Sequence, residues 1–313
     1  GFAIITLLLL IISLSSLFNI NSIGSSVDNL NDQAVPALNE VAAVKVDILE
    51  LGSVQLETFY DEKVGEVDAH RKEFEASRSS LFSSLNELNR LIQGAGQGDR
   101  IDAIEKDSQK YVDLIDRLFN QQREYLELQT TTASQLDEIA FNIDDAAIML
   151  LDTMDMSNNE VISREASNVE SSLSSLITLM YDLNKANKLD SAEVIRSEID
   201  INIDSIRPRL EVLENEATGR TETMVSDAIT TVRNAIDSLQ GNGSYPANVI
   251  RRQQLRVDAE NSLNSSQTQL NKLMTETDEL QNAVRGIAED TRVSVTDSIS
   301  TSSWINSIIT VVS

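Results

Sequence analysis

Two arginines are the residues best placed to bind a ligand. Arg71 and Arg78 lie seven positions apart and continue the apolar series of Leu85 and Ile92, so they are expected on one helix face, turned toward a packed interior. A guanidinium in such a place requires a partner, and its planar donors match a carboxylate or a phosphate. The spacing therefore predicts a site for a small anionic or zwitterionic ligand.

Polar side chains from three further segments are expected close to these arginines. When the predicted helices are aligned by their lengths, Gln55 and Gln122 come to the height of Arg71, and Thr277 comes closer to Arg78. Together they would form a polar layer that holds the ligand inside a helical bundle.

The two arginines also have a purely structural interpretation. At the edge of the apolar face they would bury only their aliphatic stems and would pair with surface acids such as Glu75 or Glu57. In that case they bind no ligand.

Another set of polar residues, in the second half of the chain, suggests a distal ligand site. These residues fall near expected core positions: Tyr181, Arg220, Thr231 and Arg252. Polar residues in a bundle rich in Ser and Thr are mostly solvated, so a surface position is the alternative for each of them.

The chain offers little catalytic or metal-binding chemistry. His70 is the single histidine, with no second histidine to complete a metal site, and there is no cysteine. The glycine-rich run at 94–98 follows a predicted helix, whereas a phosphate-binding loop follows a strand. We therefore expect no enzymatic activity, no cofactor and no bound metal. We interpret His70 as a surface histidine, with pH sensing or metal binding as the alternative.

Charge and composition narrow the class of protein further. Acidic residues outnumber basic ones by 50 to 25, and the net charge of −25 argues against a nucleic-acid partner, because phosphate backbones require a basic surface. Only 11 glycines and 3 prolines interrupt the 313 residues, too few for the turns of a sheet protein. The fold class is therefore predicted to be all-α, built from long helices.

Both ends of the sequence are apolar. Residues 2–18 contain no charged side chain and, as a helix, would nearly cross the core of a bilayer, so residues 1–23 are predicted to form a first transmembrane helix. A cleaved signal peptide is the competing interpretation. Trp304 opens the apolar run 304–313, the predicted start of a second transmembrane helix with its indole at the membrane interface. Residues 24–303 would then lie in the periplasm, outside a bacterial inner membrane.

Apolar periodicity predicts six helical segments between these ends. Hydrophobic residues at helical spacing, with clusters of Gly, Pro and Asn as stops, place these segments at about 27–60, 66–93, 100–156, 160–184, 192–240 and 247–303. Kinks are expected at Pro36 and Pro208, because proline removes an amide donor from a helix interior.

The lengths of these helices decide the predicted architecture. The third and sixth span about 56 residues, or roughly 85 Å, whereas the first, second and fourth reach only about 40 to 55 Å. One bundle cannot hold both sizes, so we predict two stacked antiparallel four-helix bundles that share the two long helices. The proximal bundle would contain about residues 24–130 with 275–303, and the distal bundle about 131–274.

Local motifs add a family likeness. Gly1-Phe2-Ala3 opens an apolar span, Val35-Pro36-Ala37-Leu38 follows it, and Phe59-Tyr60-Asp61 precedes the second helix. With this layout the chain resembles the helical bimodular ligand-binding domain of methyl-accepting chemotaxis receptors, and it is similar to the sensor region of trimethylamine-oxide sensor histidine kinases.

The resemblance implies a function but leaves the ligand open. Members of the chemoreceptor family bind small metabolites, including organic acids, inside the bundles, with arginines of the first periplasmic helix among the contacts. Residues 27–60 of this chain contain no arginine and a single cation, Lys45. The family likeness therefore gives the class of protein and not its stimulus.

We expect a receptor without catalytic activity of its own. Ligand would shift the long last helix by about an ångström or two, and the second transmembrane helix would pass the signal to cytoplasmic signalling partners. The alternatives are the input domain of a sensor histidine kinase that reads a periplasmic binding protein, and a structural coiled-coil filament. Apolar positions in excess of one seam, Val27, Leu30 and Leu38, predict a parallel homodimer.

Overall fold

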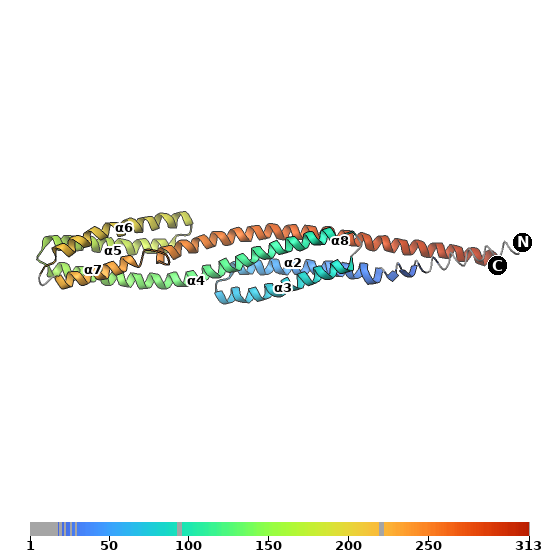
Figure 1. The fold of residues 1–313 in the computed structure, drawn as a ribbon, viewed down its shortest axis with the longest axis horizontal. Coiled ribbons are helices and arrows are strands. Elements are labelled where there is room, and N and C mark those ends of the chain that lie inside the picture. Colours follow the sequence, from blue (N-terminus) through green and yellow to red (C-terminus); the bar gives the residue numbers. More distant parts are fainter. Residues whose placement is uncertain are drawn as a thin grey trace. The chain divides into compact units, whose positions relative to one another are not determined.

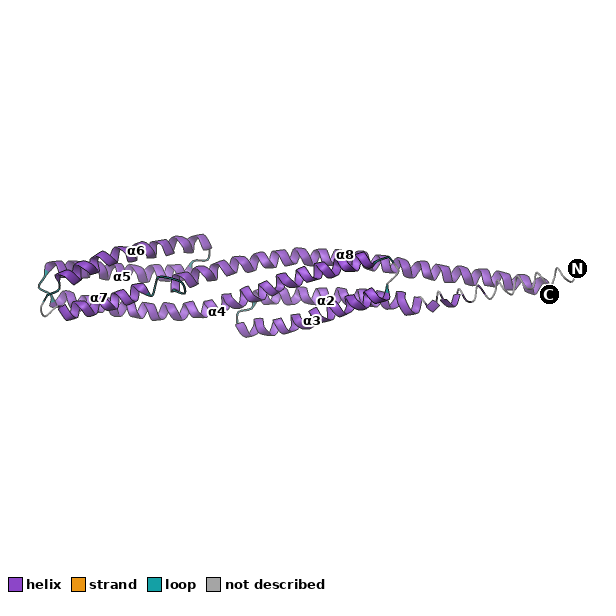
Figure 2. Cartoon of the chain, viewed as in Figure 1, coloured by secondary structure: helices purple, strands orange, loops and turns teal. Residues whose placement is uncertain are grey.

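The part of the chain that the structure describes consists of helices joined by short turns and loops. The computed structural model describes residues 18, 21, 23–25, 27–28, 30–92, 96–218 and 222–312. Over these residues the chain forms helices and contains no strand, which confirms the predicted all-α fold class (Figure 2).

The predicted membrane segments are mostly beyond this description. The first transmembrane helix, expected at residues 1–23, lies almost entirely outside the described residues. Among the helices that are described, none combines the length and the apolarity needed to cross a bilayer. Trp304, the predicted interfacial residue, lies exposed on the last helix.

The helices follow the predicted order along the chain, and two of them are much longer than the rest (Figure 1). α4 has 59 residues and α8 has 68, in agreement with the two long helices expected from periodicity. The elements are η1 (Leu30–Ala34), α2 (Val35–Tyr60), α3 (Val64–Leu91), α4 (Gly98–Met156), α5 (Glu160–Lys185), α6 (Leu189–Glu216), α7 (Glu222–Asp237) and α8 (Tyr245–Val312).

The irregular element η1 has a local cause. Pro36 has no amide hydrogen and cannot donate to the carbonyl of Asp32, four residues earlier. Asp32 lies in the π-helical turn η1, and regular α-helix begins at Val35, beside the proline. The irregularity expected at Pro36 therefore takes the form of a π-helical turn that precedes it.

One predicted helix is in fact two. The sequence predicts a single helix over 192–240 with a kink at Pro208, and this prediction is wrong. α6 continues through Pro208 to Glu216, and α7 begins at Glu222. The proline is tolerated because Pro208 and Asp204, whose carbonyl loses its donor, are both exposed to water. Gly219, between the two helices, is the sequence signal for the break.

The first of two compact units contains the N-terminal helices and parts of both long ones. It comprises Gly1–Tyr60, Asp68–Leu118 and Ser262–Ser313. Fully buried side chains come from α2, α3, α4 and α8, for example Leu51, Phe74, Tyr111 and Leu273 respectively. α2 and α8 approach closely at Gly52, where a Cβ atom would lie 2.8 Å from Leu270 Cδ2.

The second unit comprises Asp61–Val67 and Phe119–Asn261. One hydrophobic core draws on α4, α5, α6, α7 and the beginning of α8, and α6 packs against both α5 and α7. α4 and α8 each contribute residues to both units. The boundary between the units falls after residue 118 in α4 and after residue 261 in α8, whereas the sequence suggested boundaries at about 130 and 274.

A buried carboxylate joins α4 to α8 in the first unit. Asp107 is 3% exposed and accepts hydrogen bonds from the ammonium groups of Lys110, at 2.5 Å, and of Lys272. Burial alone would raise the pKa of Asp107, but the two ammonium groups outweigh it and lower this pKa to about 2. Burial also raises the pKa of the neighbouring Glu276. Asp107 therefore stays ionised to a lower pH than Glu276 does.

Replacing Asp107 with Asn should lower the free energy of unfolding by about 1 to 2 kcal/mol at pH 7, because one pKa unit corresponds to about 1.4 kcal/mol and the partly exposed lysines weaken the effect. The pKa is depressed in the folded state, so this stabilisation is present above the ordinary value of 3.8 and is lost as the pH falls toward 2. Urea unfolding across this pH range measures the difference.

Glu276→Gln is the matched control. Its carboxylate already suffers from burial, so a neutral amide should leave stability unchanged or raise it at pH 7. An Asp107→Asn variant as stable as the parent at pH 7 would contradict the role given to this ion cluster.

Candidate functional site

Gln55, a predicted ligand contact, is fully buried and bonded within the protein. Its amide nitrogen donates to the backbone carbonyl of Leu263 at 3.5 Å, and its amide oxygen accepts from the Tyr111 hydroxyl at 2.7 Å. Burial raises the pKa of Tyr111, which keeps the phenol protonated as a donor. Gln55 therefore links α2 to α4 and α8 as part of the core of the first unit.

Gln122 and Thr277, two further predicted contacts, are also buried. The Gln122 amide donates to the carbonyl of Asp61 at 2.8 Å, and the Thr277 hydroxyl donates to the carbonyl of Leu273, one turn earlier in α8, at 2.7 Å. Both side chains thus bond to backbone carbonyls.

Arg71 and Arg78 reach surface acids. Arg71 Nη2 lies 3.6 Å from Asp116 Oδ1, and Arg78 Nη1 lies 3.3 Å from Glu75 Oε2, with about a third of each arginine side chain exposed. This arrangement is that of the structural alternative, with Glu75 as the acid beside Arg78 and Asp116 as an acid beside Arg71. The structure therefore brings the arginines to acids at the surface, while Gln55 and Thr277 bond inside the unit.

The four distal candidates lie in different environments. Tyr181 is exposed. The Thr231 hydroxyl donates to the carbonyl of Asp227, one turn earlier, at 3.0 Å. Arg220 lies outside the described residues. Arg252 is buried, and it is the member of the set that borders a cleft.

Arg252 is a buried cation with neutral hydrogen-bonding partners. Arg252 is only 8% exposed, and its Nη1 donates to Thr132 Oγ1 at 2.9 Å. Nη2 lies 3.4 Å from both the backbone and the side-chain oxygen of Asn184. These bonds join α8 to α4 and to the end of α5. Since a buried charge is costly without a counter-ion, the surroundings of Arg252 favour an anion.

An open cleft of about 510 Å³ adjoins Arg252 in the second unit. Three of its lining side chains are cationic, and among the described residues that line it none is acidic. The lining consists of Tyr125, Gln129 and Ala133 of α4, Asn184, Lys185, Ala186 and Asn187 at the end of α5 and after it, and Arg252, Gln253 and Arg256 of α8.

Contacts between the helices fix the walls of this cleft. The Arg256 guanidinium carbon lies 5.9 Å from the centre of the Tyr125 ring, within range of a cation–π interaction. Gln253 donates to the carbonyl of Ala186 at 2.7 Å and holds the end of α5 against α8. The cleft is therefore a partly preformed site that presents guanidinium, ammonium and amide donors to a small ligand.

Sequence reasoning identified Arg252 but missed the rest of this lining. Arg252 and Arg256 are four residues apart and share a helix face, and this spacing was a usable signal for a basic patch. The contribution of α5 was not accessible in the same way, because Asn184 is 68 positions from Arg252.

Comparison with known proteins gives a likeness of fold. No protein-family model matches the chain, and no curated protein matches it. A crystal structure of the TorS sensor domain in complex with TorT, in the presence of TMAO, is similar with a TM-score of 0.63 and 9% sequence identity, over 80% of this chain and 99% of that one. The sensor domain of the V. parahaemolyticus histidine kinase TorS is 13% identical, with a TM-score of 0.47, over 81% of this chain and 99% of that one.

The first of these structures confirms, at the level of fold, the predicted similarity to the sensor region of trimethylamine-oxide sensor kinases. The chain has the helical fold of a TorS sensor domain.

Gln55→Leu should lower the free energy of unfolding by about 1 to 3 kcal/mol, because it leaves the buried Tyr111 hydroxyl without its acceptor. In the double variant with Tyr111→Phe both polar partners are gone, so part of this loss should be recovered. Arg71→Ala, which removes the partly exposed ion pair with Asp116, should cost less than about 1 kcal/mol. Denaturant unfolding of these three variants and of Tyr111→Phe alone measures the losses. Simple addition of the Gln55 and Tyr111 losses would show that the two side chains do not interact.

Proposed function

We propose that this chain is the sensory input domain of a bacterial membrane-anchored signalling receptor and that it lies in the periplasm. The observation that carries the proposal is the fold shared with the TorS sensor domain over 99% of that chain. Since a fold alone does not determine function, the proposal also requires a site, and the cleft beside Arg252 supplies one.

The cleft suits a small anion that bears a carboxylate, phosphate or similar group. Arg252 and Arg256 offer planar donors that match such groups, and Lys185 adds a third positive charge. Arg256 uses its Nε to donate to Glu260 at 3.3 Å, so a ligand would take its terminal nitrogens. The chain as a whole carries a net charge of −25. A group of three cations around one opening therefore contrasts with the remainder of the molecule, which would repel the same ligand.

Two kinds of output remain candidates for the receptor. In a chemotaxis receptor, which the sequence favours, the ligand binds the chain directly and shifts α8. In a sensor histidine kinase the input can come from a second protein, and the TorS sensor domain was crystallised with such a partner, TorT. Direct binding of a small molecule is the property that separates them.

A thermal-shift and calorimetry screen of the full chain against acetate, succinate, citrate, phosphate and amines tests direct binding. We expect an anion to raise Tm, with a gain of about 2.7 kcal/mol in stability at a hundred times its Kd. Arg252→Gln and Arg256→Gln should each weaken binding about tenfold or more, because each removes a charged hydrogen bond.

Arg196→Gln is the matched control, since it removes an exposed positive charge of α6 in the same unit. It should leave the affinity unchanged. Loss of binding in Arg71→Ala, with the cleft variants unaffected, would place the ligand in the first unit. A set of anions that all leave Tm unchanged would contradict direct sensing and favour a partner protein.

The proposal includes a homodimer, for which α2 provides a surface. One face of α2 is buried in the first unit, whereas a second apolar stripe remains exposed: Val35, Ala42, Val46, Leu49, Leu56 and Tyr60. Of the residues first expected at the seam, Val27 is exposed and Leu38 is partly buried.

The spacing of this stripe fits a coiled-coil seam. Val35, Ala42, Leu49 and Leu56 repeat every seven residues, and Val46 and Tyr60 follow two of them by four. These are the a and d positions of a heptad, which pair with the same positions of an identical helix in a parallel dimer. An exposed apolar seam of this kind marks a protein contact.

Leu49→Cys should form a disulfide-linked dimer under mild oxidation, because d-position side chains meet at the centre of a parallel seam. The chain has no native cysteine, so the introduced thiol is the only one present. Ser79→Cys, on the exposed surface of α3, is the control and should give little dimer. Equal amounts of dimer from both variants, or monomer from both, would contradict the α2 interface.

A further inference from the structure

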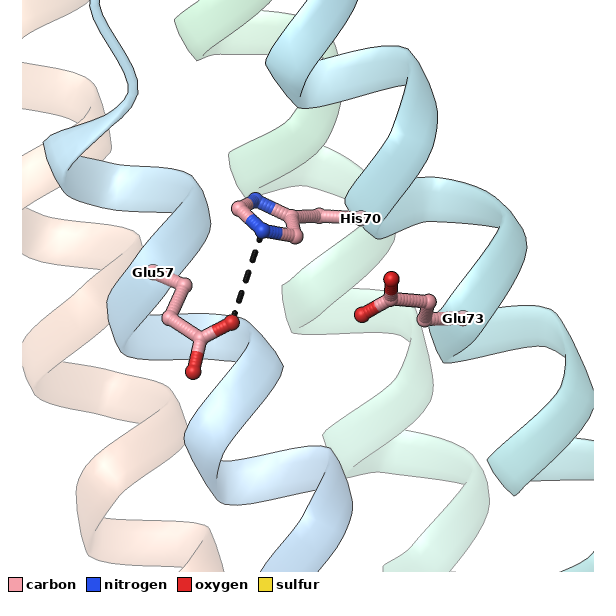
Figure 3. A group of neighbouring side chains, drawn as sticks. All are labelled: Glu57, His70 and Glu73. Atoms are coloured by element: carbon pink, nitrogen blue, oxygen red, sulfur yellow. Dashed lines mark ion pairs between the residues drawn. The ribbon is translucent and has the colours of Figure 1, made fainter.

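Three side chains in the first unit converge from two helices. Glu57 comes from α2, and His70 and Glu73 lie three residues apart on α3, so that they share one face of the helix (Figure 3). One ligand atom from each residue lies within 4.8 Å of the other two. Glu57 Oε2 is 3.4 Å from His70 Nε2.

These distances suit a shared metal ion. Zinc binds nitrogen and carboxylate oxygen at about 2.0 to 2.2 Å, so two ligand atoms of a tetrahedral site lie about 3.4 Å apart. The pair formed by Glu57 and His70 already has this separation. Glu73 has a flexible side chain, exposed to solvent, that can close the remaining distance by rotation.

Charge and surroundings support the same interpretation. Two carboxylates that approach one imidazole repel each other, and a divalent cation between them removes this repulsion. Ser53, one turn before Glu57, donates to Glu57 Oε1 at 3.0 Å and leaves Oε2 directed at His70. Hydrogen bonds of this type orient the ligands of metal sites.

We propose that Glu57, His70 and Glu73 bind a divalent transition-metal ion, with zinc as the preferred class. The ion joins α2 to α3 and raises the stability of the first unit, because it binds the folded arrangement of the three ligands. Three protein ligands leave a coordination position for water or for a small molecule. The site is separate from the cleft beside Arg252, which belongs to the other unit.

Calorimetric titration of the purified full chain with zinc chloride, after removal of any affinity tag and treatment with a chelator, tests the proposal. We expect one zinc ion per chain and a rise in Tm on binding. Cobalt(II) should give the visible absorption of a tetrahedral nitrogen and oxygen site. His70 is the single histidine, so zinc should shift the one imidazole signal in the NMR spectrum.

Four variants give the matched comparison. His70→Ala, Glu57→Gln and Glu73→Gln should each weaken zinc binding at least about tenfold. Glu198→Gln, which removes an exposed charge from α6, should leave it unchanged. Circular dichroism establishes that each variant is folded, so a loss of affinity reports the site.

Three results would overturn the metal site. One is a parent chain that binds no zinc at millimolar concentration. Another is unchanged affinity in His70→Ala or in either ligand-glutamate variant. The last is an equal loss of affinity in Glu198→Gln and Glu57→Gln, which would show diffuse binding to an acidic surface.

Discussion

α4 and α8 contribute to both units and are bonded to each other in each of them. Because an α-helix rises by only about 1.5 Å per residue, helices of 59 and 68 residues are needed to take part in two cores. In the first unit Asp107 and Lys272 connect these helices, and in the second unit Thr132 and Arg252 do so. Sliding of one long helix along the other has to break such pairs, so each unit constrains the position of α8.

Helix periodicity carried most of the fold prediction, because a helix that buries one face needs apolar residues at a regular spacing. The error at Pro208 shows the limit of this reasoning. A proline in a helix costs stability mainly through its missing donor, and an exposed position allows water to compensate. The proline was therefore tolerated inside α6, which ends at Glu216 with Ala217 as its C-cap. Whether a proline ends a helix depends on how deeply it is buried, and the spacing of apolar residues in the sequence does not give this burial.

The site was less predictable because it depends on contacts between distant segments. A heptad places a residue on a face only coarsely, and the long stem of Arg71 or Arg78 lets its head reach an acid at the surface. The cleft requires the end of α5 to meet α8, a contact between Asn184 and Arg252 that no local motif encodes. A single histidine in the sequence gives no signal of a metal site, because the neighbours of His70 in the structure are the carboxylates of Glu57 and Glu73.

Under the proposed function, the helices that line the cleft determine how a bound anion would act on α8. A ligand changes a conformational equilibrium only through a difference in its affinity for the two states. Arg252 and Arg256 move with α8, whereas Asn184 belongs to α5 and Tyr125 to α4. An anion bound by groups from all three helices therefore binds best at one position of α8 relative to α4 and α5. α8 also forms part of the first unit, where Lys272 holds it against Asp107. An anion that favours one position of α8 beside Arg252 therefore acts on this same helix.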